Sequence, residues 1–444
     1  MSQISRRKFI LTAGATALGT AILHGCASSP KGNDSAATTT NTNSATPATT
    51  TGGADAPEVT TARLGFIALT DSAPLIIAKE KGLFAKHGMP DVEVIKQASW
   101  GATRDNLELG SAGNGIDGAH ILSPMPYLMT IGKITKQPVP MYIVARLNTN
   151  GQAISIANTQ ASLKLETDSS PLKEVFLKAK SSGKEMKAAV TFPGGTHDLW
   201  MRYWMAAGGI NPNQDLSLIV VPPPQMVANM KVGTMEAFCV GEPWNAQLVA
   251  QDLGYTAVTT GEIWKDHPEK AFTLRADWVD KNPKAAKALT MAVLEAQQWC
   301  EKAENKKEMA DIISKREWLK IKAEDILPRL QGNIDFGNGR KVENSPLKMK
   351  FWADNASFPY KSHDTWFMTE EIRWGYIPAN TDVKALVDKV NRDDIWREAA
   401  KSLGVPAAEI PTTSSRGVET FFDGVKFDSE NPTAYLKALK IKKA

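Results

Sequence analysis

The sequence predicts an α/β protein with a two-lobed folded body behind an N-terminal export signal. Apolar runs of strand length alternate with helical stretches between residues 63 and 300, and 42% of the 444 residues are hydrophobic. A strand, a helix and a further strand in this rhythm form a βαβ unit and favour a mostly parallel sheet. At about 100–200 residues per domain, this length suggests two or three structural units.

The first 26 residues predict a twin-arginine-like lipoprotein signal peptide. Arg6 and Arg7 open a basic region, a short and weakly apolar stretch follows over residues 11–23, and the letters LHGC end at Cys26. A basic start, a short apolar core and small residues before a cysteine are typical of export signals. We therefore expect lipid on Cys26; a plain signal peptide cut elsewhere near this cysteine is the alternative.

Residues 27–57 predict a flexible tether. The segment consists largely of Ser, Thr, Ala, Gly, Asn and Pro and has almost no large apolar side chain. Such a composition cannot bury enough surface to offset the entropy that ordering would remove. A lipid at one end of this segment and a folded body at the other describe a protein held at a membrane surface.

Charge, cysteine content and missing motifs exclude several function classes. The formal net charge is only +4, without the basic patch or stripe of a nucleic-acid binder. Three cysteines without a CxxC pair, and six histidines, do not assemble a zinc or iron–sulfur site, and Cys239 and Cys300 are expected to be buried. No phosphate-binding glycine loop, nucleophile elbow or HExxH motif occurs, so no catalytic residue and no enzyme activity are predicted.

The first lobe is expected to begin with a strand, a helix and a strand. Residues 63–69 form a buried apolar run, Pro74 can stand in the first turn of the helix, and Gly88 follows its basic last turn. Residues 91–95 alternate between apolar and polar side chains, which predicts the next strand.

The same alternation returns further along the chain. Residues 187–192 predict a strand, which two glycines and a helix up to Gly208 follow. The other predicted elements are strands over residues 218–221 and 236–240 and a long helix over residues 282–300 with Asn282 as its N-cap.

We expect two lobes and a C-terminal extension in the folded body. The first lobe takes residues 58–147 and 249–330, the second takes residues 148–248, and a C-terminal extension over residues 331–444 packs on both. The extension lacks the βαβ rhythm and is rich in aromatic residues, which predicts a helical and irregular wrap. We expect the lobes to join near residues 146–150 and 241–250 and to hinge there around a ligand.

Residues 192–200 are a candidate anion site. Two glycines let the backbone approach a bound ligand closely, and Thr196 or Asp198 can cap the helix that follows. The N–H groups at the start of a helix attract negative charge. His197 can donate a hydrogen bond there, with a purely structural contact as the alternative. Trp100 follows a predicted strand end, where ligands of open α/β sheets gather, with a core or lid position as the alternative.

Several long segments of residues 58–444 together resemble one known family. They include QASWG, TFPGGTHDLWMRYW, PPPQMVANMKVGTMEAFCVGEPWNAQL, RADWVDKNPKAAKAL and SRGVETFFDGVKF, in one order along the chain. The chain is thereby similar to the nitrate/bicarbonate-binding lipoproteins of cyanobacterial ABC importers, and its lipoprotein signal and Ser/Thr-rich tether fit that family too.

The resemblance implies a C-shaped, two-lobe fold of the periplasmic-binding-protein kind with an anion in the cleft. In nitrate-binding members the pocket uses residues that match Trp100, Gln152, His197 and Lys270 and the backbone of Gly241. The implied ligands are nitrate and nitrite, without a cofactor and without nucleic acid. The implied partners are an ABC permease and its ATPase subunits. The implied location of this protein is the periplasmic side of the inner membrane, to which it is anchored by lipid.

Three alternatives stay open. The bicarbonate-binding sibling is similar in fold, uses calcium, and has an acidic residue where nitrate binders have a lysine; Glu269 directly precedes Lys270, so a shift of one residue would exchange the two interpretations. An enzyme of the related thiamine-pyrimidine-synthase fold would need a cysteine-rich iron segment, which three scattered cysteines do not supply. An anion-sensing domain of a regulatory ATPase disagrees with the export signal and the missing phosphate-binding loop.

Overall fold

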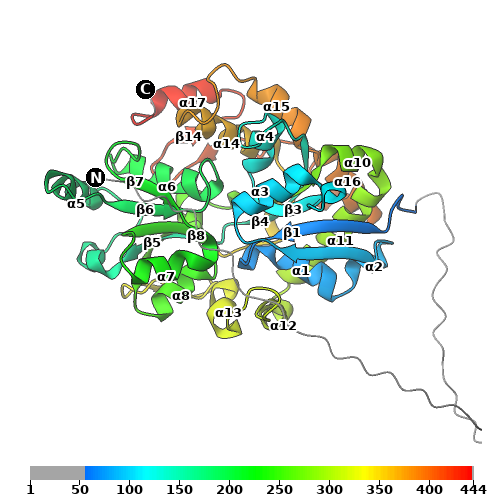
Figure 1. Cartoon of the computed structure of the whole chain (residues 1–444), viewed down its shortest axis with the longest axis horizontal. Helices are drawn as coiled ribbons and strands as arrows, with labels where there is room; N and C mark the ends of the chain where they lie inside the picture. The colour runs from blue at the N-terminus through cyan, green and yellow to red at the C-terminus, as the bar shows by residue number, and fades with distance from the viewer. Residues whose placement is uncertain (1–55, 443–444) are drawn as a thin grey trace, which may run out of the picture. The chain divides into compact units, whose positions relative to one another are not determined.

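The computed structural model describes residues 56–442. The predicted signal peptide, Cys26 and all but the end of the predicted tether lie outside the described residues. The described residues belong to one compact unit, and Figure 1 shows its two sheets with helices around each. No helix among residues 56–442 is both long and apolar enough to cross a membrane.

The first sheet has five strands, which pair partly in parallel and partly in antiparallel fashion. Its order is β2 (Asp91–Lys96), β1 (Thr61–Phe66), β3 (Gly118–Leu122), β10 (Pro268–Arg275) and β4 (Met141–Thr149). Strand β1 runs parallel to β2 and β3, whereas β10 is antiparallel to β3 and β4. The predicted strand–helix–strand unit therefore forms the parallel half of this sheet.

The second sheet repeats this pattern of directions. Its order is β7 (Ser217–Val220), β6 (Lys187–Val190), β8 (Ala237–Gly241), β5 (Gln152–Ala157) and β9 (Gly254–Thr259). Strand β6 is parallel to β7 and β8, and β5 is antiparallel to β8 and β9. Each sheet thus has one antiparallel strand next to its edge: β10 in the first sheet and β5 in the second.

The chain passes between the two sheets at two places. It leaves the first sheet after β4, through Asn150 and Gly151, and it returns between Thr259 and Pro268. The crossing expected near residues 241–250 is not there, because α8 (Trp244–Ala250) and β9 continue the second lobe. The second sheet therefore extends beyond residue 248, the lobe boundary that the sequence predicts.

Helices cover both sheets and fill the connections. The first lobe is covered by α1 (Ala73–Glu80), α2 (Leu83–Lys86), α3 (Trp100–Leu109), α4 (Met125–Thr130), α10 (Ala276–Lys281), α11 (Pro283–Glu301) and α12 (Lys306–Ile313). The second lobe includes α5 (Pro171–Ser181), α6 (Thr196–Ala207), α7 (Met226–Lys231), α8 and α9 (Thr260–Ile263), and α13 (Ala323–Gln331) packs on α8 and α12.

The start of α11 is capped by a residue from the beginning of the body. The Glu58 carboxylate accepts hydrogen bonds from the Lys284 and Ala285 backbone N–H groups, at 3.1 and 2.9 Å. Asn282, the predicted N-cap, makes no side-chain cap and instead donates to the Trp278 carbonyl. The glutamate takes this role because a carboxylate is favoured at the positive end of a helix.

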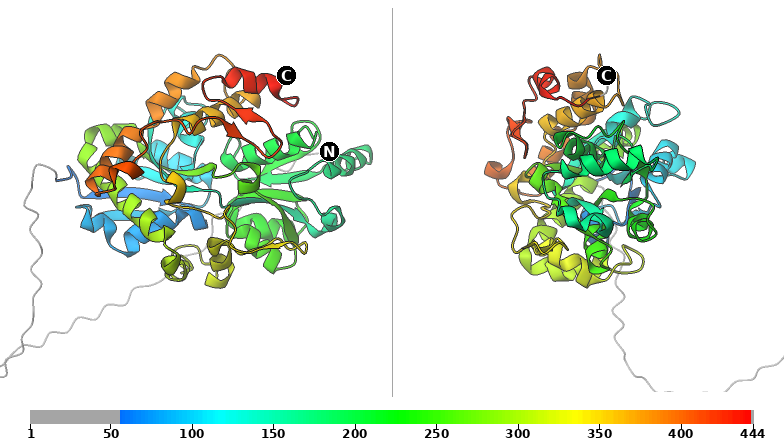
Figure 2. Two further views of the ribbon diagram at one scale, coloured as in Figure 1. Left: turned by 180° about the vertical axis from the view of Figure 1, so that it is seen from behind. Right: turned by 90° about the vertical axis from the view of Figure 1, so that its left-hand side faces the viewer.

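The C-terminal region packs along both lobes. Its helices are α14 (Lys361–Arg373), α15 (Val383–Val390), α16 (Asp393–Ser402) and α17 (Pro432–Ala438). Figure 2 shows these orange and red elements running over the blue and the green parts of the body. Trp366 of α14 stacks on Trp200 of α6 at 5.0 Å between ring centroids and on Phe421 at 5.5 Å. This buried aromatic stack ties the extension to the second lobe.

Candidate anion-binding site

The five residues that the sequence assigns to a binding pocket lie together between the two sheets. Trp100 begins α3, Gln152 begins β5, His197 stands in the first turn of α6, Gly241 ends β8 and Lys270 belongs to β10. All five are buried, and the Lys270 side chain has no exposed surface. Three of these elements belong to the second lobe and two to the first, so the cluster joins the lobes.

Lys270 is held between two carboxylates. Its Nζ lies 3.0 Å from Asp71 Oδ2 and 2.9 Å from Glu269 Oε1. Burial alone would lower the pKa of this ammonium group, but the two carboxylates reverse that effect and raise its pKa above the ordinary value. Its Nζ also lies 5.8 Å from the centre of the Trp100 ring, within cation–π range. Lys270 is therefore charged at neutral pH.

Gln152 connects the lobes through its amide nitrogen and is held within its own lobe through its amide oxygen. Its Nε2 donates to Asp71 Oδ2 at 2.9 Å, and its Oε1 accepts from His197 Nε2 at 2.7 Å. Gly241 is paired with Gln152 across the antiparallel β5–β8 ladder. A Cβ at Gly241 would lie 2.6 Å from Gln152 Oε1, so this position requires glycine for the amide to lie where it does.

The hydrogen bonds of His197 fix its proton. Because an amide oxygen only accepts, the bond to Gln152 places the proton on Nε2, and Nδ1 accepts from the Thr191 hydroxyl. Burial, with the nearby Lys270 charge, holds the pKa of His197 well below its usual value. The imidazole is thus a neutral N–H donor, the kind of group that the sequence predicts at this position.

The expected cap of α6 does not form. The Thr196 hydroxyl donates to Glu269 Oε1, and Asp198 accepts from the Gly194 backbone N–H at 2.9 Å. Neither side chain caps the helix, whose N-cap position is Gly195. The start of α6 contributes the Thr196 and His197 side chains to the cluster.

Asp71 is the member of the cluster that the sequence misses. It lies in a short 3-10 turn (Thr70–Ser72) that follows β1, and it is fully buried. Its carboxylate accepts from Gln152, Lys270 and His120 Nε2, the last at 2.7 Å. Burial alone would raise the pKa of Asp71, but Lys270 and His120 hold it well below its ordinary range. The one signal in the sequence is an acid directly after a buried strand, which also fits an exposed turn.

Glu269 faces the cluster because of an irregularity in β10. The register of β10 against β4 shifts on both sides of Lys270, and Glu269 has no partner on β4. Its carboxylate accepts from Trp200 Nε1 at 2.8 Å, from the Thr196 hydroxyl and from Lys270. Burial raises the pKa of Glu269, and these three donors oppose the rise. Glu269 and Lys270 therefore both belong to the cluster, where they form an ion pair.

Trp100 supplies a donor that has no partner within the described chain. Its indole Nε1 is buried and makes no hydrogen bond among residues 56–442. The ring lies 5.3 Å from the His120 ring, next to the Asp71 carboxylate. Buried N–H groups are normally paired, so this donor is available to a bound acceptor.

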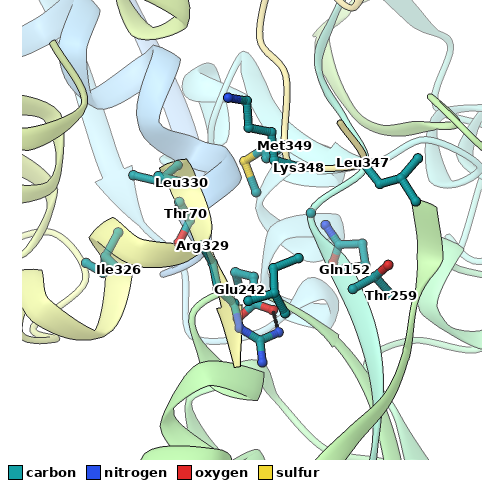
Figure 3. Close-up of a pocket in the computed structure, with 12 residues that line it drawn as sticks. Thr70, Gln152, Glu242, Thr259, Ile326, Arg329, Leu330, Leu347, Lys348 and Met349 are labelled. Atoms are coloured by element: carbon teal, nitrogen blue, oxygen red, sulfur yellow. Dashed lines mark hydrogen bonds and ion pairs between the residues drawn. The ribbon is translucent and has the colours of Figure 1, made fainter. Parts of the chain in front are cut away.

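A recess opens beside Gln152. Its volume is about 390 Å³, counting the part that is open to solvent. Figure 3 shows Gln152 and Thr259 on one wall, with Leu330 of α13 and Met349 among the residues opposite. The Thr70 hydroxyl, which also lines the recess, is buried and has no hydrogen-bond partner among the described residues. Gln152 thus both lines the recess and donates to Asp71 of the charged cluster.

Metal-binding groups are not assembled in the described part of the chain. Among residues 56–442, no group of three or more His, Cys, Asp or Glu side chains is placed to hold a metal ion. Cys239 and Cys300 are buried free thiols, as the sequence predicts. The cluster combines one ammonium, two carboxylates and several neutral N–H donors.

Comparison with known proteins gives close relatives over the whole chain. The chain is 63% identical to the "Nitrate/nitrite binding protein NrtA" of Nostoc sp., over 100% of both sequences. It is 46% identical to the "Bicarbonate-binding protein CmpA" of Synechococcus elongatus, over 99% of both. The nitrate/nitrite relatives are thus considerably more similar to this chain than the bicarbonate relative.

A solved structure and a family model agree with these relatives. The crystal structure of the periplasmic nitrate-binding protein NrtA from Synechocystis is similar with a TM-score of 0.85 and 67% identity, covering 87% of this chain and 100% of that one. That similarity confirms the predicted two-lobe fold. The model of the NMT1-like family matches residues 55–314, more than half of the sequence. The chain therefore belongs to the NMT1-like family, together with these cyanobacterial binding proteins.

Proposed function

We propose that this protein is the substrate-binding component of an ABC importer and that it captures nitrate, and also nitrite, in the cluster around Lys270. The observation that carries the proposal is that N–H groups from both lobes, among them one buried ammonium, lie in a single buried cluster. Gln152 Nε2 donates to Asp71 and His197 Nε2 donates to Gln152 Oε1, whereas the Trp100 indole N–H has no partner among the described residues.

The chemistry of nitrate fits this set of donors. Nitrate is a planar monoanion that accepts hydrogen bonds and has no proton to donate. A site for it should offer N–H donors, and the Lys270 ammonium, the Gln152 amide and the neutral His197 imidazole are such donors. The indole ring of Trp100 can pack flat against a planar ion or donate its N–H group to it. Gly241 brings backbone close to the same place.

Bicarbonate is the second candidate, and the charges around Lys270 disfavour it. Bicarbonate carries a hydroxyl that needs an acceptor, and the site implied for the bicarbonate-binding sibling includes calcium. In this protein the two buried carboxylates, Asp71 and Glu269, are already paired with the Lys270 ammonium, at 3.0 and 2.9 Å. The higher identity to nitrate/nitrite binding proteins supports the same choice.

The recess beside Gln152 is the proposed route of entry. It lies next to the passage from β4 to β5, which is one of the two connections between the lobes. An opening of the lobes about Asn150 and Gly151 would widen this recess and expose Gln152. Closure would then return Gln152 to Asp71 across the cleft.

The cellular setting follows from the same assignment. We place the protein on the periplasmic side of the inner membrane, anchored by lipid on Cys26 and delivering its anion to a permease driven by ATPase subunits. The support is the signal-like N-terminus and the relatives, which are named as binding proteins, one of them periplasmic. In this role the ligand is passed on unchanged, so no catalytic residue is required.

Calorimetric titration of the purified body with nitrate, nitrite and bicarbonate, each with and without calcium, tests the proposal. We expect saturable binding of nitrate and nitrite that calcium does not alter. Binding of bicarbonate that depends on calcium, with no nitrate binding, would establish the sibling function instead.

A further inference from the structure

Two buried carboxylates surround the only ammonium group of the described cluster. Asp71 and Glu269 each have no exposed side-chain surface, and each lies within 3.0 Å of Lys270 Nζ. Asp71 comes from the turn after β1, whereas Glu269 lies on β10 beside the lysine itself. Two separate parts of the first lobe therefore direct negative charge at the same cation.

The other titratable groups that face this cluster add no positive charge. His120 on β3 donates to Asp71, His197 on α6 lies 3.7 Å from Glu269, and His267, just before β10, lies 3.8 Å from Glu269. Burial lowers the pKa of all three imidazoles, to about 3 for His267, so they are neutral at neutral pH. The Cys239 thiol is also buried, and burial raises its pKa. With two carboxylates facing one ammonium, the cluster holds no surplus positive charge before any ligand is considered.

We infer that Asp71 and Glu269 determine the charge selectivity of the site, admitting monoanions and rejecting dianions. This inference rests on the proposed anion-binding function and adds to it the class of anion that is refused. A bound anion meets the Trp100 N–H, which has no partner among the described residues, and the Gln152 and His197 N–H groups, which donate to Asp71 and Gln152 in this structure, but no surplus positive charge. A monoanion can be held by such donors, whereas a second negative charge would meet two carboxylates in a buried and weakly screened place.

A merely structural role for these carboxylates makes a different prediction. If Asp71 only positioned Gln152 and Lys270, its loss would weaken the binding of every anion to a similar extent. If it sets charge selectivity, its loss must change the ratio of dianion to monoanion affinity. The ratio of sulfate to nitrate affinity separates the two roles, because the two ions differ in charge and neither donates a proton at pH 8.

The test compares Asp71→Asn and Glu269→Gln with the unchanged protein by calorimetry with nitrate and sulfate at pH 8 and constant ionic strength. The unchanged protein should favour nitrate over sulfate by about a hundredfold or more, and each variant should shift that ratio toward sulfate by about tenfold or more. Glu370→Gln is the matched control, because Glu370 is an equally buried carboxylate that pairs with Arg373 instead. It should leave the ratio unchanged.

The outcomes distinguish this inference from the proposed function. An unchanged ratio in folded Asp71→Asn and Glu269→Gln would overturn the inference while leaving nitrate binding intact. Absence of nitrate binding by the unchanged protein would overturn the proposed function itself. If both variants fail to fold, the ratio of nitrate to sulfate affinity of the unchanged protein at low ionic strength is the test. Equal affinities for the two ions would contradict the inference. A preference for nitrate of about a hundredfold would support it.

Discussion

Glu269 and Lys270 are consecutive residues of one strand, yet the carboxylate and the ammonium meet at 2.9 Å. Neighbouring side chains of a regular strand point to opposite faces of the sheet. The register shifts of β10 against β4 on both sides of Lys270 remove that alternation. Both side chains consequently reach one cluster, and an assignment of either residue alone to the site would be incomplete.

Removal of the Lys270 charge should abolish nitrate binding. Lys270 is the cation between Asp71 and Glu269, and without it two unpaired carboxylates would face the bound anion. We therefore expect Lys270→Gln to lower nitrate affinity at least about a hundredfold, and Lys270→Glu to leave no measurable binding. Because Asp71 and Glu269 would lose their cation, stability should also fall, by about 3–5 kcal/mol.

Calorimetry, with circular dichroism to monitor folding, measures both effects. Lys306→Gln is the control, since Lys306 is a second buried lysine that donates to the Cys300 carbonyl, away from the cluster. Nitrate affinity that stays within a few-fold in folded Lys270→Gln would remove this lysine from the pocket.

A methyl group at Gly241 should disturb the site more than the fold. The Cβ of Gly241→Ala would lie 2.6 Å from Gln152 Oε1 and 3.1 Å from Leu69, so the Gln152 amide must move away from His197. We expect a loss of nitrate affinity of about tenfold or more, corresponding to about 1.4 kcal/mol. Gly113→Ala, whose Cβ would make only ordinary contacts with Leu109, should bind as the unchanged protein does.

Acidification should destabilise the folded body. An unfolded histidine takes up a proton below about pH 6.5, whereas burial lowers the pKa of His267 in the fold to about 3. Between these values only the unfolded chain gains the proton, so stability decreases as the pH falls from 7 to 5. One such histidine contributes about 2 kcal/mol at pH 5. Thermal melts across this range should show the decrease, and His267→Gln should make it smaller; an unchanged slope in this variant would contradict the assignment.

Nitrate should draw the lobes together. With connections at Asn150–Gly151 and between Thr259 and Pro268, the two sheets can rotate about these passages. X-ray scattering should give a smaller radius of gyration for the nitrate-saturated body than for the nitrate-free one. An identical scattering profile at saturation would indicate a rigid pocket.

Lipid on Cys26 should decide where the protein partitions. A Cys26→Ser variant should be unlipidated and appear in the aqueous phase of a detergent extraction, while the unchanged protein stays in the detergent phase. Cys300→Ala, which alters a buried thiol, serves as the control. A Cys26→Ser protein that remained with the detergent would contradict the lipid anchor.

Local patterns in the sequence predicted much of the fold. The strand expected at residues 91–95 is β2, the strand at 187–192 contains β6, and the helix at 282–300 is α11. These elements follow from periodicity and from prolines and glycines at their ends, which depend on near neighbours only. The antiparallel insertion of β10 beside β3 was not predicted, because pairing between distant segments leaves no local pattern.

The donors of the buried cluster were named as site residues from the sequence, and its acids were not. His197 and Trp100 stand beside recognisable turns and strand ends, whereas the roles of Gln152, Gly241 and Lys270 were implied by the family resemblance. Asp71 lies in the sequence Leu-Thr-Asp-Ser, which is also typical of an exposed turn, and only tertiary packing buries it. The orientation of Glu269 depends on an irregular register that no spacing rule predicts.

Strand β10 follows all strands of the second sheet in sequence but belongs to the first sheet, and this has a consequence for synthesis of the chain. The strands of the second sheet are contiguous from Gln152 to Thr259, so a ribosome completes them in one uninterrupted stretch. The first sheet must wait for β10, although four of its five strands have been made long before. Lys270 is therefore the last of the predicted pocket residues to be translated. A nascent chain cannot hold an anion with this lysine until its first lobe, begun earliest, has been finished.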